Sequence, residues 1–186
     1  MALLRFCKDE KPEDGLPVWR LNLVQEIITD RYRDIPKKNR EVPLVWSIMH
    51  MYTTTQLAKI FALKRNLNPE LAGLICIFHD VHTLHTGEHR DHGVKAEPYV
   101  KEIIEEYNER WGSELGYITD DETALIIESI AVHSDKLTIS DDPYTELLKD
   151  VDSLDAYLHG MEPLESNGRF DRVNSTLKEL GLPQIL

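Results

Sequence analysis

Histidine and aspartate residues recur along this chain at positions that predict the buried face of a helix. His50 follows Trp46 by four residues and precedes Phe61 by eleven, offsets that place all three on one helical face. Asp152 lies in the same way within an apolar stripe, four residues after Leu148. A single inward histidine is usually a hydrogen-bonded core residue. Several such groups on separate helices instead predict a metal site inside a helical bundle, because buried titratable side chains are costly unless they are paired or bind a metal.

The candidate metal ligands come from several separate predicted helices, and they are His50, His79, Asp80, His92, His133 and Asp152. His79 and Asp80 end an apolar helix, where neighbouring positions diverge by about 100° and can flank one point. His92 begins the next predicted helix, and His133 ends a later one. Each residue has a structural alternative: His79 with Asp80, for example, would also suit a helix C-terminus that carries a cation and a neighbouring carboxylate.

Three stretches of sequence carry these residues in a recognisable order, and they are WSIMHMYTTTQLAKIFA, AGLICIFHDVH and LLKDVDSLDAYL. Together they resemble the HD phosphohydrolase superfamily, over the range from about Pro43 to Leu158. The resemblance implies an all-α bundle that cleaves phosphate esters with divalent metals. The residues that match the primary metal ligands are His50, His79, Asp80 and Asp152. Asp150 and Asp155 are expected to face solvent or to support the ligands.

Two further segments resemble those of dinuclear members. EHRDHGVKAEPYV resembles the His-then-Gly segment after the HD helix, and ESIAVHSDK resembles the segment with the next histidine. They imply that His92 and His133 bind a second metal, with Asp80 bridging both. Six imidazole and carboxylate ligands favour iron or manganese, with cobalt, nickel, magnesium and zinc as alternatives. We therefore expect two divalent metals per chain.

The predicted activity is metal-dependent hydrolysis of a nucleotide or another small phosphorylated metabolite. A bound divalent metal lowers the pKa of water from about 15.7 toward about 7, which supplies hydroxide at neutral pH. Asp80 is the predicted catalytic carboxylate. Lys95 and Lys136, three residues past His92 and His133, are candidate phosphate contacts, with an exposed surface lysine as the equal alternative. Two other functions fit the same ligands: an iron-dependent oxygenase, and a non-catalytic binding or regulatory module with a structural metal.

This sequence departs from the family pattern at two positions, and these departures affect the prediction of the substrate more than that of the metal site. His82 replaces a glycine that often lies two residues after the HD aspartate, and His133 stands alone where paired histidines are frequent. His82, His85 and His89 are additional candidates in a polar loop, with mobile surface histidines as the favoured interpretation. His159 is expected at the surface.

The sequence predicts seven helices, which carry these residues. Helical spacing predicts them at about 16–35, 43–65, 69–80, 92–111, 120–133, 143–159 and 170–180, with a polar loop over 81–91. The helix that begins at Pro69 is apolar on every face, which predicts the buried centre of the domain. No segment alternates with a period of two, so the fold class is all-α.

Composition limits the remaining possibilities. The 186 residues, 41% hydrophobic and 29% charged, suit one helical domain over 16–186 after a polar lead-in at 1–15, with the motifs in a core at 43–160. The net charge of −12 disfavours duplex nucleic acid as a partner but does not exclude a small phosphorylated substrate.

The two cysteines, Cys7 and Cys76, form no disulfide framework, and no signal peptide or membrane span is evident in the sequence. We therefore expect a cytoplasmic location. The apolar C-terminal sequence LPQIL leaves a homodimer open.

Overall fold

The computed structural model describes residues 15–35 and 37–185, and no β-strand occurs among them. The longer helices are α2 (Trp19–Arg31), α3 (Leu44–Lys64), α4 (Pro69–Phe78), α7 (Glu97–Leu115), α8 (Asp120–Val132), α9 (Pro143–Leu158) and α10 (Arg169–Glu179). The shorter elements are the helices α5 (Val81–Thr86) and α6 (His92–Lys95) and the 3-10 turns η1 (Tyr32–Asp34) and η2 (Glu165–Asn167). The prediction of an all-α fold with about seven main helices is confirmed.

Helix α4 is the centre of the bundle, as its uniformly apolar sequence predicted. It begins where the Asn68 side chain accepts hydrogen bonds from the backbone N–H groups of Glu70 and Leu71, with Pro69 in the first turn. Every residue from Glu70 to Phe78 is buried. The helix contacts α2, α3, α8 and α9. Its C-terminal end, which carries the His-Asp pair, is therefore surrounded by protein on several sides.

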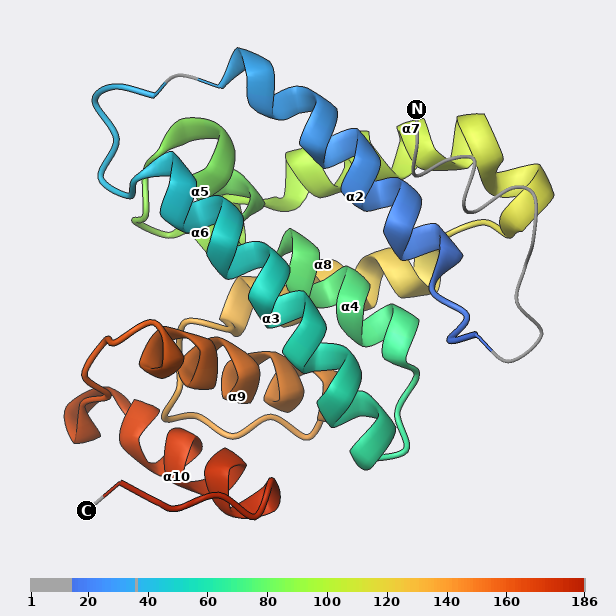
Figure 1. Cartoon of the computed structure of the whole chain (residues 1–186). Coiled ribbons are helices and arrows are strands. Elements are labelled where there is room, and N and C mark those ends of the chain that lie inside the picture. The colour runs from blue at the N-terminus through green and yellow to red at the C-terminus, as the bar shows by residue number, and fades with distance from the viewer. Residues whose placement is uncertain (1–14, 36, 186) are drawn as a thin grey trace.

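The other helices cover α4 in two groups (Figure 1). Helices α2 and α7 pack together at one end, and α10 packs against the outside of α9 at the other end. Helix α3 crosses α4 and also contacts α9. A cluster of buried hydrophobic side chains contains residues from every main helix, from Leu21 on α2 to Leu177 on α10.

Two predicted helix boundaries were wrong. Residues 81–86, predicted as loop, form α5, because Val81 and Leu84 are fully buried and provide an apolar face within a polar sequence. The predicted helix at 92–111 is divided into α6 and α7, and the second helix has Pro98 in its first turn. Proline has no N–H to continue the ladder of the preceding helix, so a new helix begins there.

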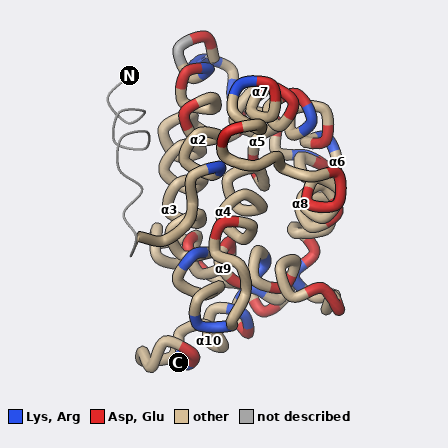
Figure 2. The backbone as a smooth tube through the Cα atoms, turned by 90° about the vertical axis from the view of Figure 1, so that its right-hand side faces the viewer, with Lys and Arg blue, Asp and Glu red and all other residues tan. Residues whose placement is uncertain are grey.

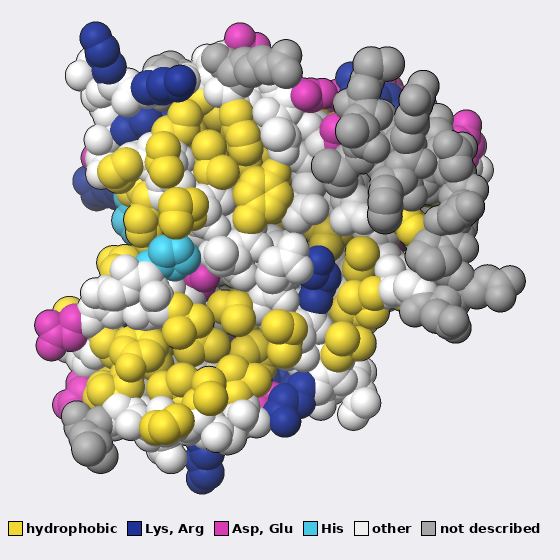
Figure 3. Space-filling model, viewed as in Figure 1, with side chains coloured by type: hydrophobic (Ala, Val, Ile, Leu, Met, Phe, Trp, Pro, Cys, Tyr) yellow, Lys and Arg dark blue, Asp and Glu magenta, His cyan; other side chains and the backbone are white. Residues whose placement is uncertain are grey.

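The surface is acidic in places and apolar in others. Acidic residues recur along α7 (Figure 2). Hydrophobic side chains gather in several patches in Figure 3. On α3, Val45, Met49, Ile60 and Leu63 are exposed. Near the C-terminus, Ile185 packs against the core cluster of its own chain, so part of the LPQIL sequence is already covered. None of the helices described is long and apolar enough to cross a membrane.

Candidate metal centre

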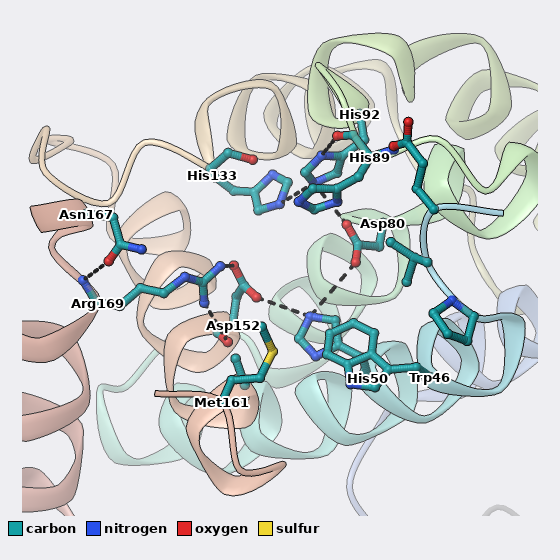
Figure 4. A pocket seen from close by; sticks show the side chains of 15 residues that line it. Trp46, His50, Asp80, His89, His92, His133, Asp152, Met161, Asn167 and Arg169 are labelled. Atoms are coloured by element: carbon teal, nitrogen blue, oxygen red, sulfur yellow. Dashed lines mark hydrogen bonds and ion pairs between the residues drawn. The ribbon is translucent and has the colours of Figure 1, made fainter. Parts of the chain in front are cut away.

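Five of the six predicted metal ligands line one pocket of about 570 Å³ between the helices (Figure 4), and the sixth, His79, lies beside them, with its Nε2 atom 3.2 Å from Nε2 of His50. His50 comes from α3, His79 and Asp80 from the junction of α4 and α5, and His92 from the start of α6. His133 directly follows α8, and Asp152 lies on α9. All six are buried, with at most 4% of each residue exposed. The structure therefore brings together side chains that are up to about a hundred positions apart in the sequence.

Each of the four histidines has its Nδ1 atom against an oxygen that can only accept a hydrogen bond. Nδ1 of His79 lies 2.6 Å from the carbonyl of Cys76, and Nδ1 of His133 lies 2.6 Å from the carbonyl of Ile130. Nδ1 of His92 lies 2.7 Å from the carbonyl of His89. Nδ1 of His50 lies 2.5 Å from Oδ2 of Asp155. These acceptors fix the proton on Nδ1, and in a neutral ring the Nε2 lone pair is then free to bind a metal.

The Nε2 atoms of these rings face one another in pairs. Nε2 of His50 lies 3.2 Å from Nε2 of His79, and Nε2 of His92 lies 3.0 Å from Nε2 of His133. Two neutral rings protonated on Nδ1 present lone pairs to each other at this distance, which is repulsive. A positive charge between the nitrogen atoms removes the repulsion.

Carboxylate oxygens complete both groups of nitrogen atoms. Asp80 points its Oδ1 atom at Nε2 of His92, 2.9 Å away, whereas its Oδ2 atom lies 3.6 Å from Nε2 of His79 and 3.9 Å from Nε2 of His50. Asp152 Oδ1 lies 3.1 Å from Nε2 of His50. Asp80 thus connects two clusters of ligand-type atoms, one containing His50 and His79 and the other containing His92.

The charge states of these groups suit metal ligands. Burial lowers the pKa of His79 and His133 below the usual value, which keeps both rings neutral. Burial alone would raise the pKa of Asp80 and Asp152, but the neighbouring cationic and imidazole groups outweigh it and hold both carboxyls ionised. His50 and His92 differ, because burial lowers their pKa but their carboxylate partners outweigh it. Hydrogen bonds with Asp152 and Asp155 raise the pKa of His50 to about 9, and the hydrogen bond with Asp80 raises the pKa of His92. The acids that stabilise a proton on His50 would equally stabilise a metal cation beside it.

The loop histidines divide into two kinds. His89 lines the pocket, stacks on His92 with ring centres 4.4 Å apart, and lies within 4.8 Å of ligand-type atoms of Asp80 and His92. His82 and His85 instead contact the ring of Tyr99 and are absent from the pocket lining. The expectation of mobile surface histidines was wrong for His82, which is buried on α5.

The two lysines predicted as phosphate contacts have other surroundings. Lys95 is exposed, lies 3.7 Å from Glu88 and does not line the pocket, which corresponds to the surface alternative. Lys136 is buried rather than exposed. Its ammonium group donates to the carbonyl of His133 and to Oδ2 of Asp152, and burial lowers its pKa to about 8. Neither lysine lines the pocket, so the structure gives no support to either predicted phosphate contact.

The structure distinguishes the two acids that were expected to face solvent or to support the ligands. Asp155 is buried behind His50, whereas Asp150 pairs with Arg65 and Arg172 on the far side of α9. His159, expected at the surface, is half-buried and lies 3.1 Å from Asp155.

Trp46 stacks on His50, with ring centres 4.4 Å apart, and lines the pocket. The four-residue spacing of Trp46 and His50 was visible in the sequence. Arg169 crosses the pocket to Asp152 from the start of α10, and no pattern in the sequence pointed to it.

Comparison with known proteins agrees with this geometry. No curated protein and no solved structure matches the chain. A family model described as HD domain matches residues 48–157, more than half of the chain. The matched range contains all six predicted ligands and ends before Arg169. The chain therefore belongs to the HD domain family, a superfamily of metal-dependent hydrolases.

Proposed function

We propose that this protein hydrolyses phosphate esters of small metabolites, using divalent metal held by His50, His79, Asp80, His92, His133 and Asp152. The observation that carries the proposal is the convergence of four Nε2 atoms, facing in pairs at 3.2 and 3.0 Å, on two ionised carboxylates. Two ligand atoms at right angles around an ion, each with a bond of about 2.1 Å, are themselves about 3 Å apart. The observed separations fit that requirement.

A proton would not satisfy this arrangement as well as a metal ion. A proton joins two atoms, whereas Nε2 of His50 has Nε2 of His79, Oδ1 of Asp152 and Oδ2 of Asp80 within 3.9 Å. A divalent cation can contact all four atoms at once. The donors are nitrogen and oxygen only, a set that suits iron or manganese in a six-coordinate geometry.

We further propose two metal positions that share Asp80. The first has His50, His79 and Asp152, and the second has His92 and His133, with His89 near enough to contribute. The two oxygens of Asp80 support this division, because Oδ1 is nearest to His92 and Oδ2 is nearest to His79. Paired metals of this kind hold both the attacking and the leaving oxygen of an in-line displacement.

The reaction would form one bond from water oxygen to phosphorus and break the bond between phosphorus and the ester oxygen, releasing an alcohol and phosphate. The bound cation would supply Lewis acidity and lower the pKa of the attacking water. The chain supplies the fixed geometry: the Nδ1 contacts hold each ring, and Lys136 holds Oδ2 of Asp152 so that Oδ1 faces His50. Residues prearranged in this way need not reorganise during the reaction.

The pocket favours a small phosphorylated metabolite, such as a mononucleotide. Its volume of about 570 Å³ is in the range of small-molecule sites. Its lining includes the apolar side chains of Val42, Pro43, Trp46 and Met161 as well as the polar metal-ligand residues. A ligand with a flat apolar part and an anionic part matches both kinds of lining residue. The acidic net charge disfavours a long polyanion.

The test is phosphate release from nucleotides, sugar phosphates and a generic aryl phosphate. The protein is first stripped of metal and then loaded with manganese, ferrous iron or cobalt. We expect turnover by the loaded wild type and background rates for His79→Ala and Asp80→Asn. His85→Ala is the matched control, because this histidine lies on α5 outside the pocket, and it should retain activity.

Two outcomes count against the proposal. No turnover of any ester by protein shown to contain metal would reject the phosphohydrolase assignment. If metal-free wild type, shown to be folded by circular dichroism, remains fully active, the metal has no catalytic role and the catalytic assignment is wrong.

A further inference from the structure

Arg169 enters the pocket from the C-terminal part of the chain, outside the range that matches the HD domain model. In Figure 4 its side chain reaches Asp152 from the side opposite His89 and Asp80. It is the only lysine or arginine among the described residues that line the pocket. We infer that Arg169 binds the anionic group of the substrate, which, resting on the proposed function, is the phosphoryl group.

The fold fixes the position of Arg169 with several contacts. The residue begins α10, where its backbone N–H donates to Oδ1 of Asn167. Gly168, immediately before it, has a φ of +75°, and a Cβ atom there would lie 3.0 Å from the carbonyl oxygen of Lys136. Arg172 then donates to that same carbonyl over 2.8 Å. The start of α10 is therefore joined to the segment that follows His133.

The Arg169 guanidinium retains donors for a ligand. It contacts Asp152 through Nη2 to Oδ2 at 3.2 Å and through Nη1 to the backbone carbonyl at 3.3 Å. Both contacts are long, and Oδ2 of Asp152 also accepts from Lys136. A guanidinium has five N–H groups, so three have no partner among the residues described. The side chain is 27% exposed, whereas that of Lys136 is 1% exposed.

The surrounding charges give Arg169 a reason to bind an anion. Glu41, Asp80 and Asp152 also line the pocket, so an entering phosphate meets three carboxylates. Metal cations at the proposed positions would offset the negative charge of the two aspartates. Arg169 adds a positive charge that the chain itself supplies. A planar guanidinium can also donate two parallel hydrogen bonds to one phosphate.

The location also suits contact with the same phosphoryl group that the metal would hold. The carboxylate of Asp152 lies between Arg169 and the first proposed metal position, with Oδ2 toward Arg169 and Oδ1 toward Nε2 of His50. An anion seated against the first metal position would therefore lie within reach of the guanidinium. Lys136 cannot take this role, because its ammonium group is committed to His133 and Asp152.

The experiment measures binding of inorganic phosphate to the full, manganese-loaded chain by calorimetry, which needs no turnover. We expect Arg169→Ala to weaken phosphate binding by about 10- to 100-fold, the equivalent of one charge-assisted contact, and Arg169→Lys to weaken it less. Manganese affinity should change by less than about threefold, because Lys136 still holds Asp152. Arg110→Ala, which removes a half-exposed arginine on α7, is the charge-matched control and should bind phosphate normally.

Equal phosphate affinity in wild type and Arg169→Ala would overturn the inference, as would a loaded wild type that binds no phosphate. If Arg169→Ala is unstable, Arg169→Lys and Arg169→Gln provide the same comparison. With an ester that is hydrolysed, the variant should raise KM more than it lowers kcat. Should no ester be hydrolysed while phosphate binding still depends on Arg169, the proposed reaction fails and the anion site stands.

Discussion

Oδ2 of Asp155 lies 2.5 Å from Nδ1 of His50, with both side chains buried. The carboxylate therefore orients the imidazole ring and directs its Nε2 atom at His79 and Asp152. A carboxylate behind a metal-binding histidine also raises the basicity of the ring, and loss of such a partner typically lowers metal affinity by about 10- to 100-fold.

We therefore predict that Asp155→Ala lowers manganese affinity by about 10- to 100-fold and that Asp155→Asn, which keeps an oxygen acceptor, has a smaller effect. Calorimetric titration with manganese measures both. Asp171→Ala removes an exposed aspartate on α10 and is the control. Unchanged affinity in Asp155→Ala would show that His50 needs no orienting partner.

Gly93 permits the close approach of α6 to α8. A Cβ atom at this position would lie 2.2 Å from the carbonyl oxygen of Ile130 and 3.2 Å from Nδ1 of His133. We predict that Gly93→Ala separates His92 from His133, weakens binding of one metal ion, and lowers stability by about 1–3 kcal/mol, a typical cost of overpacking.

Gly112→Ala tests whether that effect is local. Its Cβ atom would collide with the ring of Tyr117 at 2.5 Å, far from the metal ligands. Both variants should melt at lower temperature, but only Gly93→Ala should change the metal stoichiometry measured by elemental analysis. The same stoichiometry in both would remove the second metal position from the proposal.

Metal should stabilise the fold, because its proposed ligands come from α3, α4–α5, α6, α8 and α9. At a free manganese concentration of about 100 times the dissociation constant, one site contributes about 2.7 kcal/mol. For a chain of this size that corresponds to a rise in Tm of about 5–11 °C. Thermal melts with manganese and with a chelator, at matched ionic strength, measure the difference. His79→Ala should lose most of the rise, and an equal rise in that variant would place the binding elsewhere.

Arg20 joins α2 to two other helices through Glu70 and Glu122, and this network predicts a pH effect remote from the metal centre. Burial raises the pKa of Glu122, but hydrogen bonds from Arg20 outweigh it and place the pKa below the usual 4.5. A depressed pKa in the folded state means that the contact stabilises the fold fully above about pH 4.5 and is lost as pH falls through the lower, folded value.

Glu122→Gln should therefore cost about 1–3 kcal/mol near pH 7, and the difference from wild type should shrink below about pH 4. Glutamine keeps the capping geometry at the start of α8, so the comparison isolates the charge. Urea unfolding of both proteins between pH 3 and 7 measures this. A difference that stays constant with pH would contradict the assigned pKa direction.

The sequence predicted the parts of the structure that depend on local periodicity. His50 and Asp152 were placed on buried faces by the apolar residues around them, and α4 was predicted as central because it has no polar face. The structure places these residues as expected, next to the His79–Asp80 pair.

Features that depend on packing between distant segments were not predictable. Arg169 reaches the pocket only because α10 packs on α9 and Arg172 bonds the carbonyl of Lys136. Lys136 was expected to contact phosphate, but the turn after α8 directs it inward to Asp152. Helix α5 was not predicted, because the sequence of 81–91 is mostly polar. The only apolar residues of this helix are Val81 and Leu84, and both are buried.

The most direct test of the account is an anomalous diffraction map from crystals of the full chain grown with manganese. We predict a peak about 2.0–2.3 Å from Nε2 of both His50 and His79 and from a carboxylate oxygen of Asp80 and of Asp152. A second peak should lie beside Nε2 of His92 and His133. A manganese-bound crystal with no anomalous density between His50 and His79 would contradict the central claim.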